Sequence, residues 1–148
     1  MWRQSVPCQR QRKIDTAMTP KILGRWKCQA PAMNRQARDP FMHSVEDKNN
    51  GKKLAEEFGY VFNPNVNYIQ SSFWVYLKWG VPPHVDGGGL CMIYLHRGGG
   101  HLCVQNKNKL HDLYIDQKSV VLFNDRQKHL WIPDSACTML VVNVRKKK

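Results

Sequence analysis

The sequence predicts a mainly β domain, built as an antiparallel sandwich or barrel, and three observations support this fold class. Short runs rich in apolar residues recur from about Tyr60 to the end of the chain. Turn signals separate these runs, namely Pro82-Pro83, Pro133-Asp134 and the glycine triplets at 87–89 and 98–100. Hardly any helical pattern lies between the runs, whereas a parallel sheet needs helical crossovers.

The first 45 residues show no sustained period of 3.6 or 2, and they predict an extended basic arm. Apolar residues such as Trp26 are scattered among prolines and basic residues, and nine Lys and Arg face only Asp15 and Asp39. We expect this arm, residues 1–45, to contain at most one helical turn. It would either lie across a partner or wrap the domain that residues 46–148 form.

The remaining elements follow from local patterns, taken in chain order. Residues 52–58 predict a short helix that Gly59 ends. Trp74, Trp79 and Trp131 are interpreted as packing residues. Strands are expected at residues 68–78, 90–96, 101–105, 113–115, 119–124 and 138–145.

Net charge is the unusual property of the composition. Twenty-three Lys and Arg against 11 Asp and Glu give +12 at pH 7, and the excess lies mainly in the arm and the terminal lysines. Such charge attracts polyanions through counterion release. We therefore expect nucleic acid, a ribonucleoprotein assembly or an acidic partner; an effect on solubility alone is the alternative. No apolar run approaches the roughly 20 residues of a membrane helix.

The five cysteines do not form a recognisable pattern. Their number is odd and there is no CxxC pair, so neither a disulfide framework nor a zinc knuckle is indicated. Cys91 and Cys103 lie in apolar runs and predict small core residues. The start of the chain has no apolar stretch typical of a secretory signal. We expect an intracellular, reducing compartment: cytoplasm, nucleus or organelle matrix.

A candidate metal site is indicated by His84-Val85-Asp86 and His129. Residues i and i+2 of a strand point to one face, so His84 and Asp86 can reach the same ion. His129 follows the apolar stretch 119–124 later in the chain. Two imidazoles and one carboxylate with open coordination positions make up the facial triad of non-haem Fe(II) oxygenases.

Three stretches carry a resemblance to a known family: YLKWGVPPHVDGGG (76–89), CMIYLHRGGGHLCV (91–104) and SVVLFNDRQKHLWIP (119–133). Residues 73–145 resemble the Fe(II)- and 2-oxoglutarate-dependent dioxygenases, nearest to their prolyl-hydroxylase-like branch. The resemblance implies a double-stranded β-helix, or jelly roll, in which His84, Asp86 and His129 hold iron. It also implies that Tyr94, and Tyr76 as a second tyrosine, line the 2-oxoglutarate pocket.

One departure from the family pattern concerns the far carboxylate of 2-oxoglutarate. The family usually places Arg or Lys nine to eleven residues beyond the distal histidine, where this chain has Thr138, Met139 and Leu140. Arg145 is the nearest later candidate, with Arg97 and Lys128 as weaker substitutes. A buried carboxylate without a charge partner is costly to desolvate.

Three functions remain open at this level. The first is an Fe(II)- and 2-oxoglutarate-dependent dioxygenase that hydroxylates or demethylates a nucleic acid or a protein, with the charge favouring nucleic acid. The second is a catalytically inactive subunit of this fold, anchored by its basic ends in a larger, possibly ribonucleoprotein, assembly. The third is a cupin-like metal protein that uses the same three ligands without a keto acid.

Overall fold

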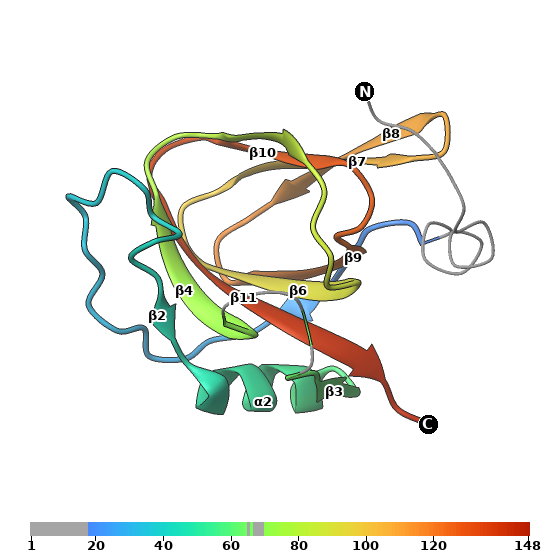
Figure 1. The fold of residues 1–148 in the computed structure, drawn as a ribbon, viewed down its shortest axis with the longest axis horizontal. Helices are drawn as coiled ribbons and strands as arrows, with labels where there is room; N and C mark the ends of the chain where they lie inside the picture. Colours follow the sequence, from blue (N-terminus) through green and yellow to red (C-terminus); the bar gives the residue numbers. More distant parts are fainter. Residues whose placement is uncertain (1–17, 65, 67–69) are drawn as a thin grey trace.

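The computed structural model describes residues 18–64, 66 and 70–148, and strands dominate it (Figure 1). One helix, α2 (Lys48–Glu57), precedes most of them. The strands are β1 (Lys21–Arg25), β2 (Val45–Glu46), β3 (Tyr60–Phe62), β4 (Ser72–Leu77), β5 (Val81–His84), β6 (Leu90–Arg97), β7 (Gly100–Asn106), β8 (Lys109–Ile115), β9 (Ser119–Asn124), β10 (His129–Pro133) and β11 (Cys137–Lys146).

Two antiparallel sheets face each other. The larger follows the order β1-β9-β6-β11-β4-β2, with β3 paired to β11, and the smaller follows β5-β10-β7-β8. From β4 onward the chain passes back and forth between them: β4, β6, β9 and β11 belong to the larger sheet, and β5, β7, β8 and β10 to the smaller. This arrangement is a double-stranded β-helix, so the predicted fold class is confirmed.

The larger sheet buries apolar side chains on both faces. Successive residues of a strand point to opposite faces, so on β6 Leu95 faces the smaller sheet while Tyr94 faces the other way. The inner core, between the sheets, includes Val75, Leu95, Phe123 and Met139. The outer core includes Trp74, Tyr94, Leu122 and Leu140, and α2 and part of the arm cover it (Figure 1).

The described part of the arm wraps the domain. Lys21–Arg25 forms β1, which pairs with β9 at the edge of the larger sheet. Beyond β1, the Trp26 ring packs edge-on against Tyr94 with centroids 5.1 Å apart, and Met33 packs against the outer core. Residues 1–17 lie outside the described part, so contact with a partner and the domain boundary at residue 46 stay predictions.

From β6 onward, β9 coincides with its predicted range, and β6, β7 and β11 differ from theirs by one residue at one or both ends. Strand β8 begins four residues earlier than predicted, and β10 was not predicted. The expectation for residues 68–78 shortens to β4, although residues 68 and 69 lie outside the described part. The helix begins four residues earlier than predicted because Asp47 caps it, accepting a hydrogen bond from Asn50 N at 3.0 Å. Trp74 is fully buried as expected, whereas the packing interpretation is wrong for Trp79, which is 70% exposed.

Within the described residues, no helix has both the length and the apolar character needed to cross a membrane. The cysteines described there, Cys28, Cys91, Cys103 and Cys137, are all free thiols. Cys91 and Cys103 are buried, as their apolar surroundings predicted.

Candidate metal centre

Pairing of β5 with β10 brings the two histidines of the candidate site together. His129, the first residue of β10, lies directly opposite His84, the last residue of β5. Their ring centroids are 4.3 Å apart. His129 is buried and also touches the ring of Phe123, while His84 is half-buried at the end of its strand. Residues that are 45 positions apart in sequence therefore become cross-strand neighbours.

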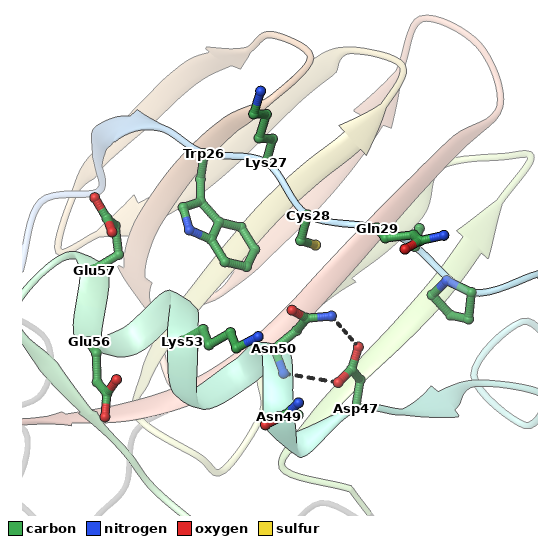
Figure 2. A pocket seen from close by; sticks show the side chains of 12 residues that line it. Trp26, Lys27, Cys28, Gln29, Asp47, Asn49, Asn50, Lys53, Glu56 and Glu57 are labelled. Atoms are coloured by element: carbon green, nitrogen blue, oxygen red, sulfur yellow. Dashed lines mark hydrogen bonds between the residues drawn. The ribbon is translucent and has the colours of Figure 1, made fainter.

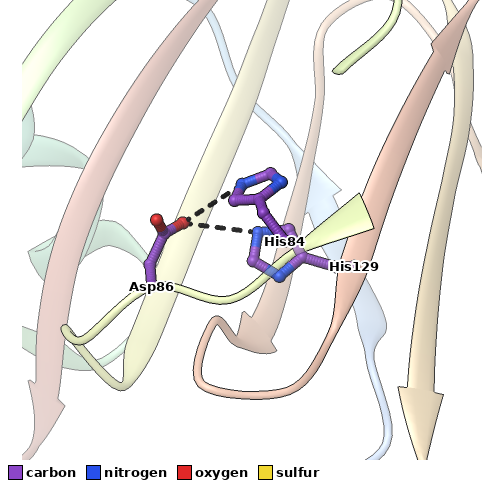
Figure 3. A group of neighbouring side chains, drawn as sticks. All are labelled: His84, Asp86 and His129. Atoms are coloured by element: carbon purple, nitrogen blue, oxygen red, sulfur yellow. Dashed lines mark ion pairs between the residues drawn. The ribbon is translucent and has the colours of Figure 1, made fainter. Parts of the chain in front are cut away.

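Asp86 completes the site from the loop that follows β5 (Figure 3). Its Oδ2 lies 3.4 Å from Nε2 of His84 and 3.4 Å from Nε2 of His129. The candidate ligand atoms of the three residues all lie within 4.8 Å of one another. Ligands about 2.1 Å from one ion and at right angles to each other are about 3 Å apart. Both distances from Asp86 are close to this spacing, so the three residues could hold a metal ion after small side-chain shifts.

Both imidazoles are held so that Nε2 faces the shared centre. His84 Nδ1 lies 2.8 Å from the carbonyl oxygen of Pro82, and His129 Nδ1 lies 2.7 Å from that of Gln127. A carbonyl oxygen only accepts hydrogen bonds, so each Nδ1 carries the proton and donates. Without a metal, a proton on Nε2 can be donated to Asp86; when a metal binds, that proton leaves and the Nε2 lone pair faces the ion, an orientation typical of histidine ligands.

The electrostatics of the site keep Asp86 ionised. Burial opposes its ionisation, but the hydrogen bonds to His129 and His84 outweigh burial and hold the pKa of Asp86 well below its usual range. The hydrogen bond to Asp86 raises the pKa of His84 above its ordinary value. A carboxylate that stays charged at neutral pH is the form that binds a cation.

Asp125 fixes the loop that carries Asp86, and it was not among the predicted site residues. It is 1% exposed. Its Oδ1 accepts a hydrogen bond from Gly89 N at 2.7 Å, and its carbonyl oxygen accepts one from Asp86 N at 2.8 Å. Its own N–H donates to the Gly89 carbonyl at 2.8 Å. The available signal was an aspartate placed directly after the apolar strand β9.

A cavity of about 330 Å³ opens beside the three ligands, between the two sheets. This volume is in the range of small-molecule sites. The ionisable side chains that line the cavity are those of the three candidate ligands, Asp125 and Cys91. Ten apolar or aromatic residues complete the wall: Phe41, Phe73, Leu77, Val81, Ile93, Leu102, Phe123, Trp131, Met139 and Val141.

The predicted 2-oxoglutarate residues do not line this cavity. Tyr94 belongs to the outer core, on the opposite face of the larger sheet, where burial raises its pKa to about 12. Its hydroxyl lies 3.1 Å from His96 Nδ1. Tyr76 occupies the same outer side of β4 as Trp74, and the Arg35 guanidinium lies 5.3 Å from its ring centroid. Strand alternation directs both tyrosines away from the triad, and their role toward 2-oxoglutarate stays a prediction.

Arg145 also lies outside the cavity lining. It lies near the end of β11, opposite Val61 of β3, and is exposed. Arg97 ends β6 and is exposed as well, and neither it nor Lys128 lines the cavity. Among the residues that the structure describes, no Lys or Arg lines the metal cavity. A dicarboxylate such as 2-oxoglutarate does not fit this lining, because its far carboxylate would meet apolar side chains.

A second hollow, the arm–helix groove, lies on the other side of the larger sheet (Figure 2). It is an open groove of about 990 Å³ between the segment Trp26–Pro31 and α2. Asp47 lies at its base and accepts hydrogen bonds from the N and Nδ2 atoms of Asn50. Burial raises the pKa of the Cys28 thiol in its wall to about 11. The groove is separate from the metal cavity.

Comparisons with known proteins show likeness of fold only. No family model and no curated protein matches this sequence. The cupin domain of Drosophila melanogaster CENP-C aligns with TM-score 0.45 and 8% identity, over 56% of this chain and 66% of that one. A cupin-2 domain protein from Shewanella frigidimarina gives 0.42 and 12%, over 68% and 95%.

A third structure, hydroxypropylphosphonic acid epoxidase from S. wedmorenis, gives TM-score 0.37 and 10% identity, over 57% of this chain and 49% of that one. TM-scores and identities this low do not transfer an activity or a ligand. The function proposed below therefore rests on the residues of this chain.

Proposed function

We propose that this chain is a metal-dependent enzyme in which His84, Asp86 and His129 hold one divalent cation, with Fe(II) as the first choice. The observation that carries the proposal is the convergence of three ligand atoms within 4.8 Å beside a cavity of about 330 Å³. Two imidazoles and one carboxylate leave coordination positions open, and Fe(II) held in this way activates O₂ for oxidation of a bound substrate.

The chain's own residues have separate tasks in this proposal. The Pro82 and Gln127 carbonyls fix the two imidazoles, and Asp125 fixes the loop of Asp86. Apolar walls would exclude water from the space beside the three ligands and would hold the substrate there. The lining favours a substrate whose reacting end is uncharged.

The finer prediction, hydroxylation or demethylation with 2-oxoglutarate, requires a cation that the described cavity lining does not supply. We therefore assign no step to 2-oxoglutarate. Its test is direct: the Fe(II)-loaded chain is incubated with 2-oxoglutarate and O₂, and succinate is measured. Stoichiometric or catalytic succinate release that His84→Ala abolishes would restore this cosubstrate.

Metal binding tests the proposal itself. We expect Mn(II), an inert substitute for Fe(II), to bind one site per chain by calorimetry, and His84→Ala to weaken binding more than about 100-fold. His101→Ala is the matched control, because His101 Nδ1 pairs with Asp112 Oδ1 at 2.7 Å on an exposed surface. Absence of stoichiometric Mn(II) and Fe(II) binding, or equal loss in both variants, would refute the metal centre.

The second candidate function is an inactive subunit that its basic segments hold in an assembly. Two observations favour it: the net charge of +12, and the absence of Lys and Arg from the described lining of the metal cavity. Deleting residues 1–17 tests it without removing β1, which begins at Lys21. The polyanion-binding proposal expects weaker affinity for single-stranded RNA and a shallower salt dependence. If the chain binds metal but consumes no O₂, and if the deletion also weakens binding to RNA, the inactive-subunit function is favoured.

A further inference from the structure

A smaller cavity of about 220 Å³, here called the vestibule, adjoins the metal cavity. The turn at residues 37–41 and the segment 76–82 line it, and Phe41, Leu77 and Val81 belong to the walls of both cavities. The Asp39 carboxylate accepts a hydrogen bond from Phe41 N at 3.1 Å, which fixes the turn. Phe41 therefore stands at the boundary between the two spaces.

The two cavities have opposite electrostatic character. The metal cavity presents Asp86 and Asp125 and no Lys or Arg among the described residues. The described lining of the vestibule includes Arg38 and Lys78. Asp39, next to Arg38 in the same turn, is not part of that lining, and its carboxylate accepts from Phe41 N. Trp79 adds an aromatic surface that is 70% exposed, with Lys78 Nζ 5.9 Å from its ring centroid.

Strand β5 sets the distance between the vestibule and the metal. Pro82 lines the vestibule, and His84, a metal ligand, lies two residues further along the same strand. Because a strand advances about 3.3 Å per residue, the two positions are about 7 Å apart. The two cavities therefore lie side by side, with Phe41, Leu77 and Val81 in the walls of both.

We propose that the vestibule binds the anionic end of the substrate, so that the substrate is a small amphipathic acid whose apolar end enters the metal cavity. This inference rests on the proposed function, since it names the substrate class of that same site. Without a metal, an acid group in the metal cavity would meet Asp86, Asp125 and apolar walls, and such burial is unfavourable. With a divalent cation bound, the vestibule competes with that cation for the acid group, so the metal-free chain isolates the contribution of the vestibule. In the vestibule it meets Arg38 and Lys78 and remains partly hydrated.

The test compares two probes of the same skeleton, 4-phenylbutyrate and uncharged 4-phenylbutan-1-ol, by NMR titration of the full metal-free chain. Omitting the metal prevents the carboxylate from binding a cation directly. We expect the acid to bind roughly three- to tenfold more tightly than the alcohol, from two exposed charge contacts. The double substitution Arg38→Gln with Lys78→Gln abolishes this preference and leaves the affinity for the alcohol unchanged.

Lys52→Gln is the matched control, because Lys52 is exposed on α2, outside the vestibule lining. The inference is wrong if neither probe binds, if the acid and the alcohol bind equally, or if the preference survives the double substitution. It is also wrong if the Lys52 variant loses as much of the preference. Mn(II) binding, measured separately, tests the proposed function, so a failure of the metal centre is distinguishable from a failure of the vestibule.

Discussion

Substitution of Asp125 by alanine tests whether the loop of Asp86 is held in place for metal binding. The change removes the carboxylate that accepts from Gly89 N at 2.7 Å. A hydrogen bond to a charged group contributes about 1.5–3 kcal/mol, so we expect the free energy of unfolding to fall by about this amount. Because Asp125 touches the loop and not the metal position, the affinity for Mn(II) should fall about 10- to 100-fold and not vanish.

Two measurements and one control decide this prediction. Urea unfolding followed by tryptophan fluorescence gives the stability, and calorimetry gives the Mn(II) affinity. Asp125→Asn keeps an acceptor oxygen and should recover most of both losses. The control is Asp134→Ala, which removes an exposed partner of the Tyr114 hydroxyl at 2.7 Å and should not change Mn(II) affinity. Wild-type Mn(II) affinity in Asp125→Ala would refute the positioning role.

Four further predictions concern stability. Asp47→Ala removes the helix cap and leaves the buried Trp74 indole N–H without its acceptor at 2.9 Å, costing about 2–4 kcal/mol in urea unfolding. Burial opposes ionisation of Asp47, but hydrogen bonds from Trp74 and Asn50 lower its pKa. The free energy of unfolding of the wild type should therefore exceed that of Asp47→Asn by a constant amount above about pH 4, and this difference should shrink as the pH falls further. An unchanged difference at acid pH would contradict this. Gly51→Ala should lower the melting temperature, at a cost of about 1–3 kcal/mol, because the added Cβ would collide with the Ser72 side chain; equal or higher stability would show that α2 can shift. Finally, Mn(II) at a hundredfold excess over its Kd should stabilise the fold by about 2.7 kcal/mol, and a chelator should reverse this shift in thermal unfolding.

The candidate ligands could be predicted from sequence because each lies in a short recognisable pattern: a His-x-Asp motif, and a histidine after an apolar stretch. His84 and Asp86 are two residues apart, at the end of β5 and in the loop after it. His129 begins β10, after β9 and a turn. The convergence of the two histidines depends on the antiparallel pairing of β5 with β10, and neither strand was among those expected from the sequence. The structure places all three around one point.

The face of Tyr94 could not be predicted in the same way. Alternation fixes that Tyr94 and Leu95 point to opposite sides, but it does not say which side faces the triad. Both faces of the larger sheet are buried, one by the smaller sheet and the other by α2 and the arm. Both sides of β6 are therefore apolar, and the pattern contains no signal to choose between them.

Strand β1 was missed for a different reason. Lys21–Arg25 is short and mostly exposed, and its own residues have no strong strand pattern. Its conformation comes from pairing with β9, about a hundred positions later in the chain. A contact of this range is a property of the fold and leaves no local signature. The arm–helix groove depends on the same wrapping.

The position of β11 has a consequence for how this domain folds. It comes last among the described strands, yet it joins β4 to β6 and also binds β3. The two halves of the larger sheet consequently stay separate until β11 has been synthesised and inserted. Contacts of such long sequence separation slow folding to the range of milliseconds to seconds. Until then, exposed strand edges are open to aggregation, and chaperone dependence during expression is the expected symptom.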